Sequence, residues 1–522
     1  MSRFDKEIDL VFTGIDPWEH AKQMYAEWEE RKKEIEKIGR TDAYATLDRD
    51  SEHTSPVDFA VLSQTGVDEN FNSITDFSPT SKYNTMKDRF GDNLMRTTET
   101  IDGYAYEEDD ASLEDVYGGY TPLGKMGKAT GYFHVEFING RFWVIDPLGY
   151  PFFRASVSTV SPTETMQAKY ESRDAWARDA MVQLRRMGFN SVGAWSDIAS
   201  ISLTERPTTL TANTGTIRAY ALEKGFIVNP HPVTAVVGGV LPVFDPEFVE
   251  FAEKQLEEYI APYVNNPFVF GWMSDNEMPA LINMLDKFLE IDPTFEPHAY
   301  SYATAWNFMY MKTGKKDVSA EDLTDELRDE FRGMMYDRYY HVVANIIRRI
   351  DPNHMYLGTR FAHAYDNKLT MQIAGYYFDV TTINYYLKTT PDTKEIQFFY
   401  NNSGKPFMFT EWYSKGMDAC SPETLLTNKS GVGFTVKTQN DRGLFYENFV
   451  LKLLECKYCV GFDEFQYRDN EPKKKDADPS NTSSNKGIYS AKGEEYTDFT
   501  KHITRVNKAK YSLINFFDER NK

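Results

Sequence analysis

The sequence predicts a (β/α)8 TIM barrel preceded by an N-terminal accessory region that wraps on it. The chain has 522 residues, which leaves room for a barrel of about 250 residues or more and an additional region. From about residue 131 onward, short apolar runs alternate with longer segments of helical periodicity. Because strands alternating with helices indicate a parallel sheet, we assign residues 1–125 to the accessory region and residues 126–522 to the barrel.

The accessory region is polar and acidic, with weak periodicity. Ala21–Lys37 is expected to form a charged helix, while Thr41–Asp115 is rich in Asp, Ser and Thr and has few apolar runs. This pattern favours a segment that packs on the main domain. A small β-rich carbohydrate-binding module is the alternative, but it needs more alternating strands than the region shows.

A β-hairpin is expected just before the barrel. Two alternating runs flank Asn139-Gly140 in the segment YFHVEFINGRFWVIDPLGYPFF, and a second turn is expected at Asp146-Pro147. Asn-Gly between two such runs is a strong signal for a two-residue hairpin turn.

Eight apolar runs are the expected strands of the barrel, and periodic segments between them are the expected helices. The strands are expected at Phe152–Val157, Asn190–Ala194, Ala219–Leu222, Phe268–Trp272, Met355–Thr359, Val380–Asn384, Pro406–Thr410 and Val460–Phe462. The helices include Arg173–Met187, Pro246–Tyr263, Ala320–Ile350 and Asp441–Glu455.

The composition excludes some partners. The formal net charge is −21, and a polyanionic surface repels phosphate backbones, so nucleic acid is not expected as a partner. No apolar run reaches 18 residues, so no membrane-spanning helix is expected. The first residues, MSRFDKEIDLVF, lack the pattern of a secretory signal. Whether a precursor carries an export signal, and which oligomeric state the protein has, are left open.

Neither a cofactor nor a metal is expected. Three cysteines, Cys420, Cys456 and Cys459, are too few for a disulfide framework. We interpret them as buried apolar residues. No cluster of His, Asp and Glu stands at metal-ligand spacing.

Two glutamates at expected strand ends carry the predicted chemistry. Glu277 follows the fourth strand, and Glu411 directly follows the seventh. Catalytic groups of such barrels stand at the carboxyl ends of strands, and retaining glycoside hydrolysis needs two carboxyl groups about 5–5.5 Å apart. Because strands four and seven face each other across a barrel mouth, we predict Glu277 as acid/base and Glu411 as nucleophile. For either glutamate alone, a solvated acid at a helix start is the alternative.

Neighbours of the two glutamates are expected to support them. Asn276 can hydrogen-bond the 2-hydroxyl of a sugar. Asp275 is expected to act from behind the site, and Tyr385 is expected to donate a hydrogen bond to Glu411.

Further residues at strand ends are candidates for binding the substrate. Three tryptophans can stack on sugar rings, with core packing as the alternative: Trp195, Trp272 and Trp412. The other candidates are Arg360, His363, Asn384, Tyr385, Glu464 and Gln466. The polar segment Asp469–Lys486 follows the last strand and is interpreted either as a substrate lid or as a plain surface loop.

Several strings, taken in order, resemble glycoside hydrolase family 50, the β-agarases. They are GRFWVIDPLGYPFF, GFNSVGAWSD, LPVFDPEF, GWMSDNE, TEWYSKGMD, GFTVKTQNDRGLFY and VGFDEFQY, between about Gly140 and Tyr489. The resemblance implies a retaining (β/α)8 hydrolase, in which Asn276 and Glu277 match the family's asparagine and acid/base and Glu411 matches its nucleophile. It also implies agarose as the substrate, cleaved at β-1,4 linkages between galactose and anhydrogalactose.

The expected eighth strand departs from the family's pattern. Asp463-Glu464 stand where the family usually has His-Trp before a Phe-Gln-Tyr string. The resemblance implies a tryptophan floor under the bound sugar here, so we expect Glu464 to replace stacking by hydrogen bonds to hydroxyls. The alternative is that Glu464 turns away and pairs with a cation such as Arg468.

The sequence therefore predicts a retaining glycoside hydrolase that cleaves β-galactosidic linkages, with agar-derived or related galactan oligosaccharides as the expected substrate. One alternative is an exo-β-glycosidase or β-galactosidase that acts on other glycans. Another is a carbohydrate-binding protein that has lost activity through the changes on strand eight.

Overall fold

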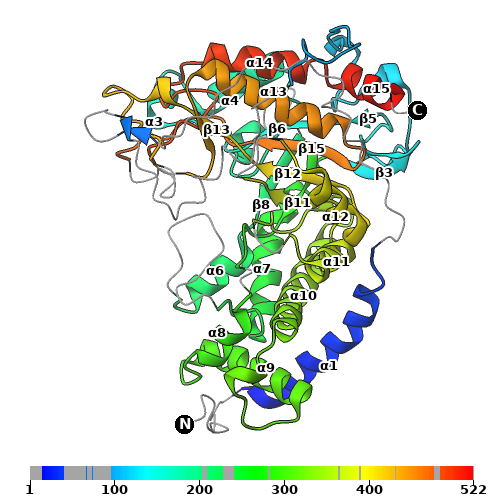
Figure 1. The fold of residues 1–522 in the computed structure, drawn as a ribbon, viewed down its shortest axis with the longest axis vertical. Coiled ribbons are helices and arrows are strands. Elements are labelled where there is room, and N and C mark those ends of the chain that lie inside the picture. Colours follow the sequence, from blue (N-terminus) through cyan, green and yellow to red (C-terminus); the bar gives the residue numbers. More distant parts are fainter. Residues whose placement is uncertain are drawn as a thin grey trace.

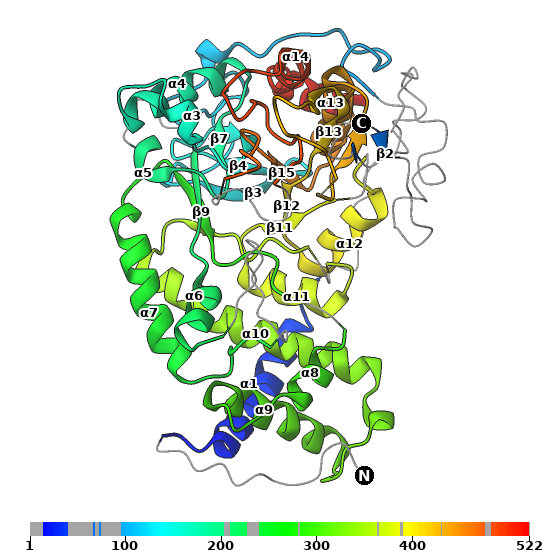
Figure 2. The same ribbon diagram turned by 90° about the vertical axis from the view of Figure 1, so that its left-hand side faces the viewer.

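The computed structural model describes residues 14–39, 66–67, 73–74, 96–202, 209–226, 240–279, 282–362, 365–386, 390–429, 431–474 and 482–520, with the backbone alone at 66–67, 73–74 and 209–213. An eight-stranded sheet lies in the upper half of an elongated molecule, and a group of helices forms the lower half (Figures 1 and 2). Among the described residues, no helix is both long and apolar enough to span a bilayer.

All neighbouring strands of the large sheet are parallel. Its strands are β6 (Arg154–Val157), β7 (Ser191–Val192), β8 (Thr209–Asn213), β9 (Val269–Met273), β10 (Met355–Tyr356), β11 (Thr381–Asn384), β12 (Phe407–Glu411) and β15 (Cys459–Glu464). Their order in space is β10-β9-β8-β7-β6-β15-β12-β11. A parallel bridge between Phe361 and Ile383 also links the segment after β10 to β11. Sequential strands lie side by side, as expected for successive strand–helix units.

One expected strand is wrong. Ala219–Leu222 lies within helix α6 (Thr216–Glu223), and the third strand of the sheet is β8. Ile217, Tyr220 and Ala221 are the buried apolar residues of α6, at the i, i+3, i+4 spacing of a helix face. A short apolar run cannot by itself distinguish a strand from a turn of helix. The other seven expected runs each overlap a strand of the sheet.

The register of the sheet shifts by one residue at three places. Phe270 is the extra residue of β9 opposite β8, because Leu210 pairs with Val269 and Thr211 with Gly271. In the same way, β12 has an extra residue at Thr410 opposite β11, and β15 has one at Val460 opposite β12. Such an extra residue exchanges the faces to which the following side chains point.

Helices surround the sheet and form the lower lobe. They are α1 (Pro17–Ile35), α3 (Glu164–Gln167), α4 (Arg173–Arg186), α5 (Ile198–Ile201), α6, α7 (Glu247–Ile260), α8 (Met284–Glu290), α9 (Glu296–Thr313), α10 (Asp325–Ile350), α11 (Lys368–Tyr377), α12 (Thr393–Ser403), α13 (Gln439–Glu455), α14 (Thr497–Asn507) and α15 (Lys510–Arg520). The four helices expected after residue 126 correspond to α4, α7, α10 and α13. The start of α13 is fixed by a capping box between Thr438 and Asp441.

Three short strands cover one end of the large sheet. β3 (His134–Ile138) and β4 (Arg141–Ile145) form the expected hairpin, and β5 (Pro151–Phe152) extends it. Asn139 and Gly140 both have positive φ, 52° and 85°, as the predicted Asn-Gly turn requires. Figure 1 shows β3 and β5 on the right of the sheet, and β13 (Ser414–Gly416) and α3 on the left. The left side carries segments that follow the carboxyl ends of strands.

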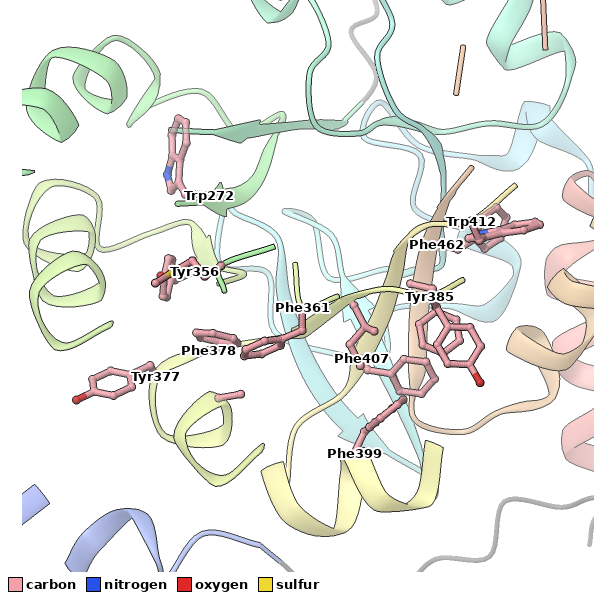
Figure 3. Packing of buried hydrophobic residues seen from close by; sticks show 14 of the residues in the cluster. Trp272, Tyr356, Phe361, Tyr377, Phe378, Tyr385, Phe399, Phe407, Trp412 and Phe462 are labelled. Atoms are coloured by element: carbon pink, nitrogen blue, oxygen red, sulfur yellow. The ribbon is translucent and has the colours of Figure 1, made fainter. Parts of the chain in front are cut away.

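Two apolar clusters pack on the two faces of the sheet. The inner cluster consists of Phe133, Val144, Phe152, Ala194, Phe270, Met273, Met355, Leu357, Val380, Met408 and Val460. The larger outer cluster lies between the sheet and the helices. Figure 3 shows part of the outer cluster, with rings such as Phe378 and Phe399 between the strands and the helices.

The described parts of the first 125 residues pack on later elements. The expected charged helix corresponds to α1, in which Arg31 pairs with Asp337 of α10 at 2.8 Å. Glu29 of α1 pairs with Lys312 of α9 at 2.8 Å. Farther along, Asp109 accepts hydrogen bonds from the backbone N–H groups of Tyr511 and Ser512. The domain boundary at residue 125 stays a prediction.

Candidate active site

Glu277 and Glu411 both stand at the carboxyl edge of the parallel sheet, where ligand sites of such sheets are usual. Glu411 is the last residue of β12. Glu277 follows β9 in a left-handed conformation (φ 50°), and its N–H donates to the carbonyl of Thr359 at 3.0 Å. A non-glycine residue held in this conformation is strained, and such residues cluster at functional sites.

Asn384 joins the two strand ends. Its Nδ2 donates to Glu277 Oε1 at 2.8 Å and to Asn276 Oδ1 at 3.2 Å. Its Oδ1 accepts from Thr410 Oγ1 at 2.9 Å, which fixes the orientation of the amide. Asn384 stands opposite Glu411 in the register of β11 and β12 because Thr410 is the extra residue.

Arg360 places a permanent positive charge beside Glu411. Its Nη2 lies 2.9 Å from Glu411 Oε1 and donates to the carbonyl of Thr410 at 2.7 Å. Its Nη1 donates to Asn276 Oδ1 at 3.2 Å. The guanidinium is fully buried, so its charge is little screened by solvent. Arg360 therefore connects the residue beside Glu277 to the carboxylate of Glu411.

Tyr386 donates the hydrogen bond to Glu411 that was expected from Tyr385. Tyr386 Oη lies 2.6 Å from Glu411 Oε2. Burial, together with the charges of Glu411, Tyr413 and Glu277, raises the pKa of Tyr386 well above its usual value, so the hydroxyl keeps its proton. Tyr385 instead stacks on Phe409 at 4.0 Å and donates to Glu395. The prediction for Tyr385 is wrong because successive side chains of an extended segment point to opposite faces.

Trp195 lies beside this network. It follows β7 with φ 65°, and the Arg360 guanidinium lies 5.7 Å from the centre of its ring. Its indole nitrogen is buried and has no hydrogen-bond partner among the described residues. An indole N–H normally finds a partner when buried, so Trp195 offers a free donor at the site.

Trp272 and Trp412 lie in the outer cluster and not at the site (Figure 3). Trp272 is 1% exposed and donates to Asp351 Oδ2 at 2.8 Å. Trp412 is 2% exposed and stacks on Phe449 of α13 at 4.0 Å. The sugar-stacking prediction is wrong for both, because the register shifts in β9 and β12 turn them toward the helices.

Glu464 turns away from the site, as the alternative expected, but the cation near it is Arg442 and not Arg468. Glu464 is 1% exposed, and burial raises its pKa to about 8 against the opposing charge of Arg442 on α13. Arg468, the expected cation, donates to the carbonyl of Ser161 and to Asn470. The sugar-floor prediction fails because Val460, the extra residue of β15, turns Glu464 to the helix side and Asp463 to the inner side, where it pairs with Arg154.

The remaining predicted residues are buried structural residues near the site, or they lie outside the described residues. Gln466 is 2% exposed and donates to the carbonyl of Arg468, so it braces the chain after β15. Asp275 accepts from the N–H of Ile217 at 3.0 Å and therefore lies behind the site, as expected. His363 lies outside the described residues, as do residues 475–481 of the expected lid.

Two aromatic residues near Glu411 were not predicted. The ring of Tyr413 lies 5.6 Å from that of Tyr386 and 6.0 Å from that of Phe465, which follows β15. Both follow expected strands, so the rule that selected Trp412 also offered Tyr413. Within the part of the chain that the structure describes, no group of three or more His, Cys, Asp or Glu side chains is arranged to hold a metal ion.

Solved structures with this fold include carbohydrate-degrading enzymes. The crystal structure of BpGH50 is similar to the chain with 30% sequence identity and a TM-score of 0.71, over 89% of this chain and 96% of that one. An exo-β-agarase is similar with 19% identity and a TM-score of 0.61, over 78% of this chain and 68% of the other. The agarase AgWH50C is similar with 22% identity and a TM-score of 0.58, over 77% and 66%.

A sequence comparison gives a consistent result. β-Agarase B of Vibrio sp. (strain JT0107) is 20% identical over 507 residues, which cover 76% of this chain. The match covers 50% of that relative, so the chain spans about half of its length. No family model matches the chain.

Proposed function

Because the chain belongs to glycoside hydrolase family 50 and is thus a glycoside hydrolase, we propose that it cleaves β-galactosidic linkages of agar-type galactan with Glu277 and Glu411 as its catalytic carboxyls. One observation carries the residue assignment. Asn384 contacts Glu277 directly, and the buried Arg360 contacts Glu411 and Asn276 together. This network holds two carboxyl groups from β9 and β12 at one edge of the sheet.

We propose different roles for the two glutamates. Glu411 accepts from Arg360 and Tyr386, so donors hold both of its oxygens in a fixed position, as a nucleophile needs. Glu277 receives an amide N–H of Asn384 on Oε1, and this donor is neutral, unlike the guanidinium beside Glu411. Glu277 is therefore the acid/base and Glu411 the nucleophile.

The proposed reaction has two steps. In the first, Glu411 attacks the anomeric carbon while Glu277 gives its proton to the glycosidic oxygen, so that the leaving sugar departs as an alcohol. In the second, Glu277 takes a proton from water, which attacks the same carbon and releases Glu411. Two inversions at one carbon give net retention.

The proposed active site also requires a closed sheet. We propose a (β/α)8 barrel, and the bridge between Phe361 and Ile383 supports closure because it joins the two ends of the strand order. Closure places β9 and β12 across one mouth from each other, as a pair of carboxyls acting on one bond needs.

The substrate is proposed from relatives whose names are β-agarase B and exo-β-agarase. The test is incubation of the protein with agarose, neoagarotetraose and p-nitrophenyl β-galactoside, with proton NMR of the first products. We expect cleavage of the agar-derived substrates with a β-configured new reducing end. Cleavage of the aryl galactoside alone would contradict the substrate, and an α-configured first product would contradict retention.

A further inference from the structure

A second hollow lies outside the catalytic network. It encloses about 280 Å³, and its walls come from α3, α4 and the segments after β15. Neither Glu277 nor Glu411 lines it. The N–H of Tyr467, one of its lining residues, donates to the carbonyl of Ser158 at the end of β6. The hollow therefore lies next to the carboxyl ends of the neighbouring strands β6 and β15.

Tyrosine rings form part of the lining of the hollow. The rings of Tyr467 and Tyr489 are 5.1 Å apart and inclined at 56°, and Tyr170 also lines the wall. Rings at such an angle present a concave apolar surface. Tyrosine supplies a large, rigid and amphipathic contact area at low entropic cost, which suits ligands that have both C–H faces and hydroxyls.

Polar groups surround these rings. Asp179 accepts from the hydroxyl of Tyr170 at 2.6 Å, and the hollow is also lined by Gln183 and Glu495, both of which accept from Arg186. Carboxylate and amide oxygens accept hydrogen bonds from hydroxyls. The hollow combines acceptors of this kind with apolar rings.

One buried hydroxyl at the wall of the hollow is poorly paired. Tyr489 is 7% exposed, and no group among the described residues meets its buried Oη with good hydrogen-bond geometry, although the side chain of Arg186 lies close to it. A buried hydroxyl is usually paired, and an unpaired one costs stability. Gly493 leaves the entrance open beside Met166, since a Cβ there would lie 3.1 Å from Met166 Cγ. A ligand hydroxyl can therefore complete the pairing of Tyr489.

We infer that this hollow is a second saccharide-binding site, which holds one sugar residue of a galactan chain near the active site. The inference rests on the proposed function for the identity of the sugar. A volume of about 280 Å³ lies at the lower end of small-molecule sites, which suits one ring and not an oligosaccharide.

The test measures binding of neoagarotetraose by isothermal titration calorimetry in a Glu411→Gln background, which prevents turnover. We expect two sites, of which Tyr489→Phe weakens only the second, by about fivefold, because one neutral hydrogen bond is lost. Tyr170→Ala should remove the second site. Tyr376→Ala is the matched control, since Tyr376 of α11 is 39% exposed and far from the hollow in sequence.

Each result has one interpretation. A single site that none of these substitutions affects would overturn the inference, while turnover of neoagarotetraose by the parent protein would leave the proposed function standing. If the parent protein does not turn over neoagarotetraose but binds it at the second site, the proposed function is contradicted and the inference stands. Thermal melting of Tyr489→Phe, which keeps the size of the side chain, checks that the fold is preserved.

Discussion

Tyr386 Oη donates to Glu411 Oε2 at 2.6 Å, while the adjacent Tyr385 donates to Glu395 on the opposite face of the chain. Two neighbouring tyrosines of one segment thus have separate functions. Tyr386 orients the proposed nucleophile, and Tyr385 packs between the sheet and the helices. This pair offers a matched test of the site.

Tyr386→Phe should lower kcat by about 10²-fold, because the substitution removes one fixed donor from the reacting carboxylate. Tyr385→Phe removes a hydroxyl from Glu395 and should lower the free energy of unfolding by about 1–3 kcal/mol, with kcat close to that of the parent. Steady-state kinetics and urea unfolding separate the two effects. Equal losses of kcat in the two variants would contradict the assignment.

Glu411→Ala should abolish turnover, and azide should restore it. The substitution removes the nucleophile and leaves a space beside Arg360, whose charge favours a small anion. Azide then attacks the anomeric carbon directly, and one displacement gives a glycosyl azide of inverted configuration. NMR of the product gives its configuration. Failure of azide to rescue Glu411→Ala, with rescue of Glu277→Ala to an inverted azide, would exchange the two roles.

Glu277→Ala should lose activity in proportion to the basicity of the leaving group. A good leaving group such as 2,4-dinitrophenolate departs without a proton, so its first step needs little help from an acid. We expect a smaller loss of kcat/KM on a dinitrophenyl glycoside than on neoagarotetraose. Equal losses on both substrates would show that Glu277 does not protonate the leaving oxygen.

Glu464 should make stability depend on pH. Its pKa in the folded protein is raised to about 8 by burial, whereas an unfolded glutamate titrates at about 4.3. Between these values the folded state holds one more proton, so the stability that Glu464 contributes is complete below the lower pKa and is lost as pH rises through the higher one. Between the two pKa values, the free energy of unfolding falls by about 1.4 kcal/mol for each pH unit.

Urea unfolding of the parent and of Glu464→Gln between about pH 4 and pH 9 measures how much Glu464 contributes to the pH dependence of stability. Glutamine has no proton to lose, so the variant should show a shallower decline and should exceed the parent in stability at about pH 9. Asp146, whose pKa is also raised to about 8 by burial and by Asp115, keeps its own slope in both proteins. Identical slopes in the two proteins would mean that Glu464 does not take up a proton on folding.

Much of the fold could be predicted from local patterns. Asn139-Gly140 specifies a turn that needs positive φ at both residues, and the structure has it. The helical periodicity of long segments was sufficient to predict the positions of α10 and α13. Ala219–Leu222 was placed in a strand because four apolar residues are too few to show a period.

The sequence by itself determined seven of the eight strand segments of the sheet and where their reactive ends lie, because both depend on neighbouring residues. Glu277, Asn276, Arg360 and Asn384 come together for this reason. Only the tertiary structure decided which face each side chain takes. The extra residues Phe270, Thr410 and Val460 are defined by pairing with another strand, and nothing in their own strands marks them.

Each of these extra residues reverses the face of the side chains that follow it, because the side-chain period of a strand is two. The same effect turns Trp272, Trp412 and Glu464 toward the helices. In β12 it also brings Glu411 opposite Asn384. The register shifts that made three predictions wrong therefore also help to build the site. Pairing between distant strands, and not local sequence, fixes where each side chain points.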